Sequence, residues 1–124
     1  IDSYQKHMKP AAYELVFDND SQPVLDLIQK VRATGANLFI NSLWPELCGG
    51  HDDDRAVELH QPDESWGWII NQGAKLIQTD RPVLLLEYFL MRHILQVKHC
   101  LSLVYVQDSY QVLLLILALQ LRFE

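Results

Sequence analysis

The stretch GAKLIQTDRP, residues 73–82, decides the fold of this chain. Its first glycine supplies the left-handed residue that ends a preceding helix. The apolar pair Leu76 and Ile77 is too short for a buried helix and long enough for a buried strand. Asp80 can accept hydrogen bonds from the free N–H groups of a following helix, whose first turn suits Pro82 because proline has no N–H to lose. We therefore predict a helix–strand–helix junction, the place where a parallel α/β sheet presents side chains to a ligand.

An earlier copy of this pattern, GANLFIN at residues 35–41, begins 38 positions before it. Another apolar segment, YELVF at residues 13–17, stops at a turn-forming Asp-Asn-Asp. Ser21 can then cap a helix, whose apolar face is formed by Val24, Leu27, Ile28 and Val31. Strands separated by helices predict an α/β fold with a parallel sheet and right-handed crossovers. Three strands do not close a barrel, so the chain is a small open α/β domain or the last part of a (β/α)8 barrel.

Composition narrows the class of protein. With 124 residues and 49% hydrophobic content, the chain can bury the core of one ordinary domain. Its net charge of −6 argues against nucleic-acid binding, which needs a basic stripe to neutralise phosphates. Cys48 and Cys100 match neither a zinc spacing nor a disulfide framework. They leave the compartment open, cytoplasmic or periplasmic.

The two ends differ in character. Residues 1–11 are polar and without a period, so we predict a loop there. A helix is predicted from Pro82 to about Leu95. Beyond it, residues 101–121 hold two apolar stretches that are each shorter than the roughly 18 to 20 residues of a membrane span. We therefore predict a buried helix or a hairpin and no membrane span.

The longest loop, residues 42–53, combines polar, glycine and aromatic residues and has the composition of a binding loop. The run His51-Asp52-Asp53-Asp54 contains ligands that metal ions accept. Consecutive residues rarely reach one ion together, and acidic residues also stabilise a helix N-terminus, so we assign no metal ligand in this chain. A short helix is predicted from Asp54, and a second after Pro62 with Asp63 as its cap. Its buried face is predicted to hold Trp66, Ile69 and Ile70.

Four phrases, in this order and spacing, together resemble the C-terminal part of a bacterial glycerophosphodiester phosphodiesterase. They are INSLW (40–44), GGHDDD (49–54), WGWII (66–70) and IQTDRP (77–82). That family is a TIM barrel, and the resemblance covers residues 10 to about 90. It implies that residues 1–95 are strands six to eight of the barrel with their helices, and that residues 96–124 are an unmatched apolar extension.

The resemblance also implies an activity. The family enzymes hydrolyse glycerophosphodiesters to glycerol 3-phosphate and an alcohol with a divalent metal ion, Mg or Ca in the full-length enzyme. In the family the acid and base histidines and the metal-binding carboxylates lie on earlier strands, and no residue here matches them. Because phosphodiester hydrolysis needs a metal or a basic clamp and a proton donor, we expect no catalytic residue in this chain and no activity from it alone.

The substrate pocket is the part of the site that this chain can supply. Phe39 and Asn41 lie two apart on a strand and face the same way, so they form an aromatic wall and a polar contact or ordinary barrel filling. Trp44 follows the strand and walls the pocket or closes its loop. Asp80 contacts the glycerol hydroxyls or caps the last helix. For a small-molecule phosphodiester we therefore name Phe39, Asn41, Trp44 and Asp80 as candidate binding residues.

Further alternatives stay open. Glu14 faces the barrel interior or covers a sheet edge, and Arg81 pairs with phosphate or is a solvated charge. A different function, a small non-catalytic α/β binding module, also fits the sequence. In either case an open three-stranded parallel sheet leaves two unpaired edges, so we expect the isolated chain to self-associate.

Overall fold

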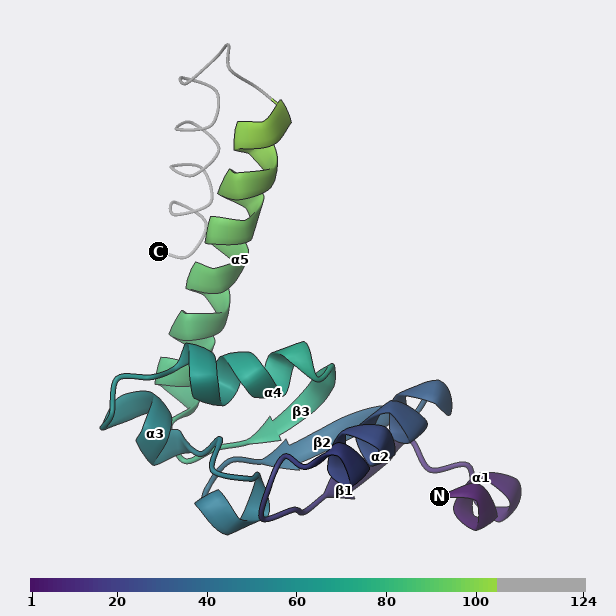
Figure 1. Ribbon diagram of the computed structural model, residues 1–124. Coiled ribbons are helices and arrows are strands. Elements are labelled where there is room, and N and C mark those ends of the chain that lie inside the picture. The colour runs from purple at the N-terminus through teal and green to yellow at the C-terminus, as the bar shows by residue number, and fades with distance from the viewer. Residues whose placement is uncertain (105–124) are drawn as a thin grey trace. The chain divides into compact units, whose positions relative to one another are not determined.

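In the computed structural model of the chain, the backbone is described for residues 1–104 and the side chains for residues 1–96. The chain divides into two compact units, Ile1–Leu86 and Glu87–Glu124. The elements are, in chain order, α1 (Asp2–His7), β1 (Ala12–Leu15), α2 (Gln22–Ala33), β2 (Asn37–Asn41), η1 (Pro45–Leu47), α3 (Asp53–Val57), η2 (Asp63–Gly67), α4 (Trp68–Asn71), β3 (Ala74–Gln78) and α5 (Pro82–Val104) (Figure 1).

The first unit is built on a parallel sheet of three strands in the order β1-β2-β3. Glu14 pairs with Phe39 across the first pair of strands, and Phe39 pairs with Leu76 across the second. The second pairing contains a register shift between Leu38 and Phe39. The predicted α/β class and the parallel sheet are therefore confirmed.

Both glycines that the sequence pattern singled out end a helix in the left-handed region. Gly35 has a φ of +79° and Gly73 a φ of +87°. At Gly73 a Cβ would also lie 2.9 Å from the Arg32 Nε, so the flexible Arg32 side chain would have to move, and the positive φ is the stronger reason for glycine here. The repeated helix–glycine–strand pattern is confirmed at both copies.

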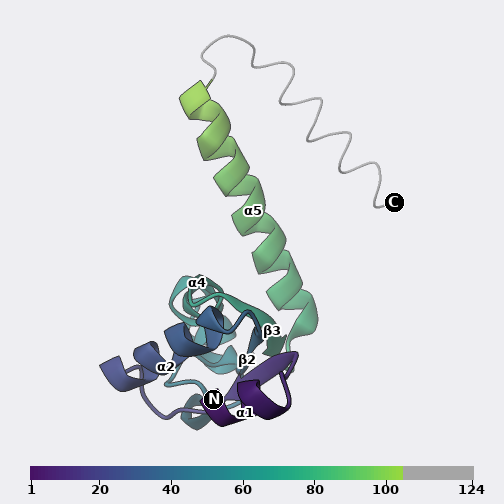
Figure 2. The same ribbon diagram turned by 90° about the vertical axis from the view of Figure 1, so that its right-hand side faces the viewer.

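The core lies on one face of the sheet. Successive strands are neighbours, and right-handed crossovers then place every connecting helix on the same side. Figure 2 shows α2 and α4 together on one side of the strands. The buried side chains of this face come from the sheet and from both helices: Leu15, Leu38, Ile40, Ile28, Val31 and Ile69.

The opposite face of the sheet is open. It carries Glu14, Phe39 and Leu76 in register, and Leu76 is 46% exposed. Phe39 is half-buried and Glu14 is exposed. The expectation that residues 73–82 contain a fully buried strand is therefore wrong for one face, because no helix of the first unit covers it. We call the set Glu14, Phe39, Asn41, Leu76 and Gln78 the open face.

Several local expectations differ from the structure. Residues 2–7, predicted as a loop, form α1, which is joined to α2 by a 2.6 Å ion pair between Asp2 and Lys30. Ser21 is the N-cap residue of α2, but its side chain makes no capping hydrogen bond. Leu27, expected on the buried face of α2, is 40% exposed. Asp63, expected as a cap, is instead the first residue of the π-helical turn η2.

The second unit is described only by its part of α5. The described part of this helix reaches Val104, beyond the predicted end near Leu95. Within it the His93 Nδ1 lies 2.9 Å from the Phe89 carbonyl oxygen, one turn earlier. None of the helices among the described residues has the length and apolar character of a membrane span. The predicted second apolar stretch falls in residues 105–124, which lie outside the described part of the chain.

The open face leads to a prediction about association. Leu76 exposes apolar surface on the uncovered face of the edge strand β3, and exposed apolar surface at an unpaired sheet edge usually finds a partner. We expect sedimentation at micromolar concentration to give a mass above that of the monomer, and Leu76→Lys to lower it. The matched control is Leu59→Lys, since Leu59 is 63% exposed but lies outside the sheet. A monomeric wild-type chain, or equal effects of the two substitutions, would contradict the prediction.

Candidate functional site

Polar side chains meet at the carboxyl ends of β2 and β3. The Asn41 side chain donates a 3.1 Å hydrogen bond from Nδ2 to the Gln78 Oε1, and its own Oδ1 accepts from the Leu43 N–H at 3.0 Å. Asn41 and Gln78 are register partners. Asn41 is 8% exposed, whereas Gln78 is exposed. The pair therefore presents an ordered amide group at the strand ends of the open face.

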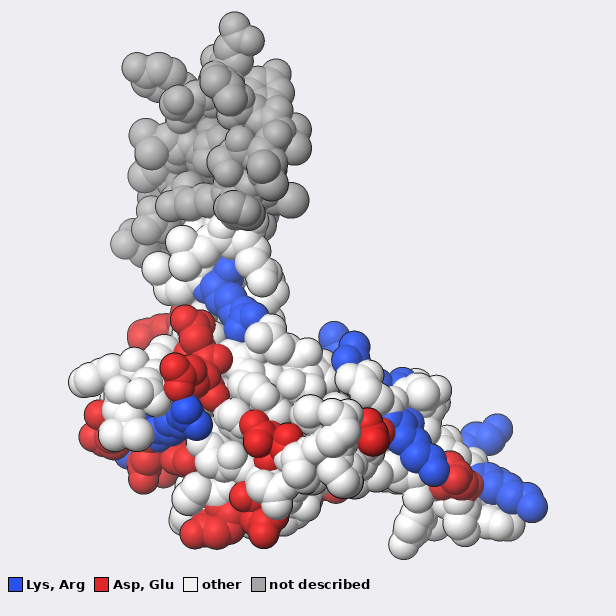
Figure 3. All heavy atoms as spheres, in the orientation of Figure 1, with Lys and Arg blue, Asp and Glu red and all other residues white. Residues whose placement is uncertain are grey.

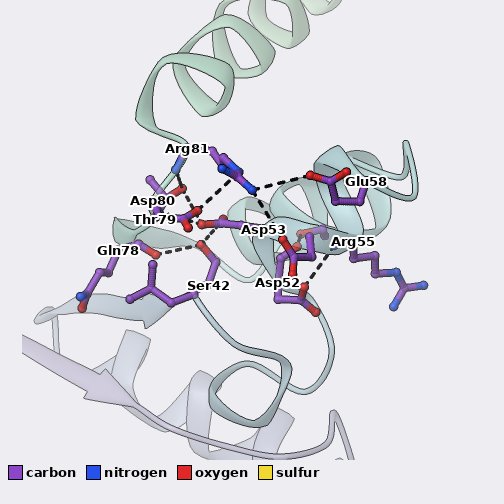
Figure 4. A network of polar contacts seen from close by, with 12 residues as sticks. Ser42, Asp52, Asp53, Arg55, Glu58, Gln78, Thr79, Asp80 and Arg81 are labelled. Atoms are coloured by element: carbon purple, nitrogen blue, oxygen red, sulfur yellow. Dashed lines mark hydrogen bonds and ion pairs between the residues drawn. The ribbon is translucent and has the colours of Figure 1, made fainter.

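A buried carboxylate, that of Asp53, organises the backbone behind this pair (Figure 4). Asp53 is 1% exposed and accepts four hydrogen bonds. Its Oδ1 accepts from the Ser42 hydroxyl at 2.6 Å and from the Trp66 indole N–H at 2.7 Å. Its Oδ2 accepts from the Thr79 hydroxyl at 2.8 Å and from the Asp80 backbone N–H at 2.9 Å. One side chain thus joins the end of β2, the turn η2 and the end of β3.

The three consecutive aspartates have three different roles. Asp52 is the N-cap of α3, and its side chain accepts from the Arg55 N–H. Asp53, the first residue of α3, points inward and also donates its backbone N–H to the Ser42 carbonyl at 2.8 Å. Asp54 points outward and its carboxylate lies 3.8 Å from the Arg81 guanidinium, with a side chain that is 76% exposed. The run therefore serves the helix N-terminus and the core, and its carboxylates do not converge on a common point.

The β3–α5 corner is held differently from the expected Asp80 cap. Arg81 immediately precedes α5, and its carbonyl accepts from the Leu85 N–H at 3.0 Å, so Arg81 occupies the N-cap position. The side-chain acceptor at this turn is Thr79, whose hydroxyl oxygen accepts from the Arg81 N–H at 2.9 Å. The Asp80 carboxylate is 60% exposed and lies 3.6 Å from the Arg81 Nε. The Thr79 hydroxyl therefore holds the turn that leads into α5, and the Asp80 carboxylate lies beside Arg81.

Arg81 is surrounded by acidic groups. Its guanidinium lies within 3.6 to 3.8 Å of the carboxylates of Asp54, Glu58 and Asp80. These distances give electrostatic attraction without short hydrogen bonds, and the three acids are more than half exposed. The neighbouring carboxylates neutralise the positive charge that a phosphate group would need. This arrangement favours the alternative in which Arg81 balances local acids.

The four candidate pocket residues occupy different environments. Phe39 and Asn41 share the open face, as their spacing on the strand predicted. Trp44 is 60% exposed, immediately before η1. Asp80 is exposed beside Arg81. The sequence analysis missed Gln78, although the alternation along β3 that places Leu76 on the open face also places Gln78 there.

The loop after β2 is tied down by its own residues. Cys48 is fully buried, and its thiol lies 3.4 Å from the Trp44 carbonyl oxygen. Burial and the nearby Asp52 charge raise the pKa of the Cys48 thiol to about 12. The His51 ring places its Nδ1 2.6 Å from the Glu64 carbonyl oxygen and stacks on Trp68. The loop is therefore a packed structure with one exposed aromatic side chain.

The charges of the first unit are separated. Figure 3 shows acidic side chains gathered around α3 and the neighbouring loops, and basic side chains around α1 and the end of α2. Beside α3 there is an open depression of about 560 Å3. It is lined by Gly50, Asp52, Asp54, Arg55, Glu58, Leu59 and Gln61. None of the four candidate pocket residues lines this depression, so it is distinct from the predicted substrate pocket.

The run His51-Asp52-Asp53-Asp54 was the strongest sequence signal for a metal centre. Across the residues with described side chains, no group of three or more His, Cys, Asp or Glu side chains could hold a metal ion. Within the run, the carboxylate of Asp53 is already saturated by hydrogen-bond donors. The divalent ion implied for the full-length family enzyme therefore has no ligand set in the described part of this chain.

The Asp53 network predicts a large stability difference between neighbouring substitutions. Asp53→Asn replaces one acceptor oxygen by an NH2 group, which faces one hydroxyl, of Ser42 or Thr79, and one buried N–H donor, of Trp66 or of the Asp80 backbone. The hydroxyl can turn to accept a hydrogen bond from the NH2 group, but the N–H donor is left unsatisfied, so we expect a loss of about 1 to 3 kcal/mol in urea unfolding. Asp54→Asn, at an exposed position, is the control, with an expected change below about 0.5 kcal/mol. Equal losses for both variants would contradict the proposed role of the network.

The raised pKa of Cys48 predicts an unreactive thiol. At pH 8 almost no thiolate forms in the folded chain, whereas an ordinary cysteine with a pKa near 8.5 is partly ionised. In a Cys100→Ser background, we expect Cys48 to react with a disulfide reagent more than about 100-fold more slowly before denaturation than after it. Similar rates in both states would show that the thiol is neither buried nor neutral.

The comparison with protein families identifies one match over the elements that hold this site. Residues 1–89 match DUF4996, a domain of unknown function. No curated protein sequence matches the chain significantly. The matched range contains β1, β2, β3 and the start of α5, and with them all four candidate pocket residues. The chain therefore belongs to the DUF4996 family.

Proposed function

We propose that this chain supplies the substrate-pocket side of a glycerophosphodiester phosphodiesterase, which hydrolyses glycerophosphodiesters to glycerol 3-phosphate and an alcohol. The phrase IQTDRP, which carries the resemblance, covers the end of β3 and the start of α5. Its Thr79 and Asp80 are held by the buried Asp53 of a second phrase, GGHDDD. The resembling phrases thus meet at one place in the structure.

The sheet supports a barrel fragment. A closed (β/α)8 barrel has parallel strands in chain order, helices on its outside only and side chains filling its inside. This chain has the same strand order, its helical core on one face and the open face on the other. In a barrel, Phe39 and Leu76 of the open face would belong to the interior layers. Further parallel βα units are then needed to cover them.

The observation that carries the proposal is the Asn41–Gln78 amide pair at the carboxyl ends of the strands. Active sites of such barrels lie at this end. The Gln78 side-chain N–H2 remains a donor for a hydroxyl or a phosphoryl oxygen, since its Oε1 already accepts from Asn41. Trp44, exposed in the following loop, can cover the alcohol part of the substrate.

Electrostatics explains why this piece needs the rest of an enzyme. A phosphodiester is an anion, and the edge near α3 is acidic, with Arg81 already paired with three carboxylates. Binding therefore needs positive charge from elsewhere, which a divalent ion supplies in metal-dependent phosphodiesterases. The described residues offer no ligand set for such an ion, and we assign it no position in this chain.

The alternative, a non-catalytic α/β binding module, is favoured by two exposed apolar side chains, Leu76 in β3 and Val16 immediately after β1. The coding sequence upstream of Ile1 separates the two functions. Further βα units that contain a histidine pair and metal-binding carboxylates would support the enzyme. A promoter and a stop codon just upstream would support the binding module.

Substrate recognition can be tested on the chain itself. We expect glycerol 3-phosphate to bind weakly and to shift the side-chain amide signals of Asn41 and Gln78 in NMR spectra. Asn41→Ala should remove the shift at Gln78. Asn37→Ala is the matched control, because Asn37 is exposed at the opposite end of the same strand. Shifts confined to α3, or unaffected by Asn41→Ala, would contradict the proposed pocket.

Catalysis should be absent from the isolated chain. Among the described side chains no group of three or more His, Cys, Asp or Glu could hold a metal ion, and the Arg81 guanidinium is paired with three carboxylates. Phosphodiester hydrolysis needs a metal or a basic clamp together with a proton donor. With Mg or Ca present, we therefore expect no release of glycerol 3-phosphate from a glycerophosphodiester above the uncatalysed rate. Metal-dependent release that is lost in Asp53→Asn but kept in Asp54→Asn would show that the chain has a complete active site.

A further inference from the structure

Two loops at the carboxyl edge of the sheet are joined to each other by their backbones. The Gly49 N–H donates to the Phe17 carbonyl at 2.8 Å, and the Phe17 N–H donates to the Leu47 carbonyl at 3.3 Å. Gly49 also packs directly on Asn19, since a Cβ there would lie 3.0 Å from the Asn19 carbonyl carbon. The loop after β1 and the loop after β2 can therefore move independently only if these backbone hydrogen bonds break.

The imidazole of His51 lies at this contact with a fixed tautomer. Its Nδ1 is 2.6 Å from the Glu64 carbonyl oxygen, and because a carbonyl only accepts, Nδ1 carries the hydrogen. In the neutral ring Nε2 is then an acceptor. This atom is buried, in a side chain that is 8% exposed, and has no hydrogen-bond partner among the residues whose side chains are described. Its nearest charged neighbour is the Asp20 Oδ2 at 3.5 Å, which is also an acceptor when ionised.

We propose that His51 and Asp20 form a pH-sensitive latch between the two loops. Protonation puts a hydrogen on Nε2 and converts two facing acceptors into a charge-assisted contact. The resulting cation lies on the Trp68 ring, with a centroid distance of 3.8 Å and an interplanar angle of 6°, where the π face stabilises it further. Protonation of the ring therefore closes the latch, and loss of the proton releases it.

The other charged groups around His51 have partners of their own. The Asp52 carboxylate accepts from the Arg55 N–H, and the Glu64 carboxylate pairs with the Arg55 guanidinium at 2.6 Å. The Cys48 thiol stays neutral because its pKa is raised to about 12. In the loop after β1, the Asp18 carboxylate accepts from the Asn19 side chain. Asp20 is the group whose interaction changes most with the charge of His51.

The consequence is a pH-dependent opening of the loop that carries Trp44. With His51 neutral, the two loops are held by backbone hydrogen bonds and ring stacking alone. With His51 charged, its ion pair with Asp20 is a further interaction that holds the loop after β1 to the loop after β2. This inference concerns loop mobility and does not depend on the proposed activity.

Hydrogen exchange of the two loops tests the latch. We would compare the wild-type chain, Asp20→Asn and the control Asp18→Asn, which makes the same charge change two residues away. At pH 5.5, Asp20→Asn should speed exchange of amides 17–21 and 47–51 by about two- to five-fold relative to wild type, as for a half-exposed ion pair. At pH 8 the same comparison should show less than about a 1.5-fold difference, and Asp18→Asn should have no effect at either pH.

A His51→Gln background gives a second measurement. If the latch operates through the imidazole, Asp20→Asn should have no pH-dependent effect in that background. The proposal is overturned if Asp20→Asn acts equally at both pH values, if Asp18→Asn acts in the same way, or if the pH dependence persists in the His51→Gln background. The activity and ligand assays do not enter into these outcomes.

Discussion

The hydrogen bonding of one buried carboxylate, Asp53, constrains the whole carboxyl edge of the sheet. An ionised carboxylate away from water is costly unless donors surround it. Here the donors come from three separate segments, through Ser42, Trp66 and Thr79 together with the backbone of Asp80. Because all of them must stay within hydrogen-bond distance of one group, the ends of β2 and β3 and the turn η2 cannot shift independently. The positions of Asn41 and Gln78 follow from this constraint.

The hydrophobic core of the first unit lies on one face of the sheet. Leu38 and Ile40 are buried under α2, while Phe39, between them, faces the uncovered side. The covered face is apolar, whereas the open face combines the apolar Phe39 and Leu76 with polar side chains at the strand ends. A parallel sheet is usually covered on both faces, and the helices of the first unit pack on one of them. The exposed Leu76 is the physical reason for our proposal that the first unit belongs to a larger assembly.

The sequence predicted those features that follow from local rules. The glycines at 35 and 73 mark helix ends because only left-handed geometry fits there, and the two apolar phrases after them form paired parallel strands. The shared face of Phe39 and Asn41 followed from strand alternation. These predictions needed no knowledge of contacts between distant residues.

Features that depend on tertiary contacts were not predictable in this way. Asp53 reads as one of three acids before a helix, and its burial depends on donors up to 27 positions away. α1 has no apolar period, and an ion pair from Asp2 ties it to α2. The exposure of Leu76 depends on which face the helices cover. The sequence favoured Asp80 as the helix cap, but in the structure the Arg81 N–H donates its hydrogen bond to the Thr79 hydroxyl.

The strand order has a consequence for how the chain acquires its structure during synthesis. Ala12 pairs with Asn37, 25 residues later, and Leu38 pairs with Ala74, 36 residues later. Within this three-stranded sheet each strand pairs with the next strand along the chain. The contact order within the sheet is therefore low for a parallel architecture. Since domains fold as the chain emerges from the ribosome at about 5 to 20 residues per second, each strand can dock within seconds of its own translation. Of the three described strands, β3 is made last. Only after it has been made can the Thr79 hydroxyl and the Asp80 N–H bind the Asp53 carboxylate, so this part of the chain acquires its structure in order from its N-terminal side.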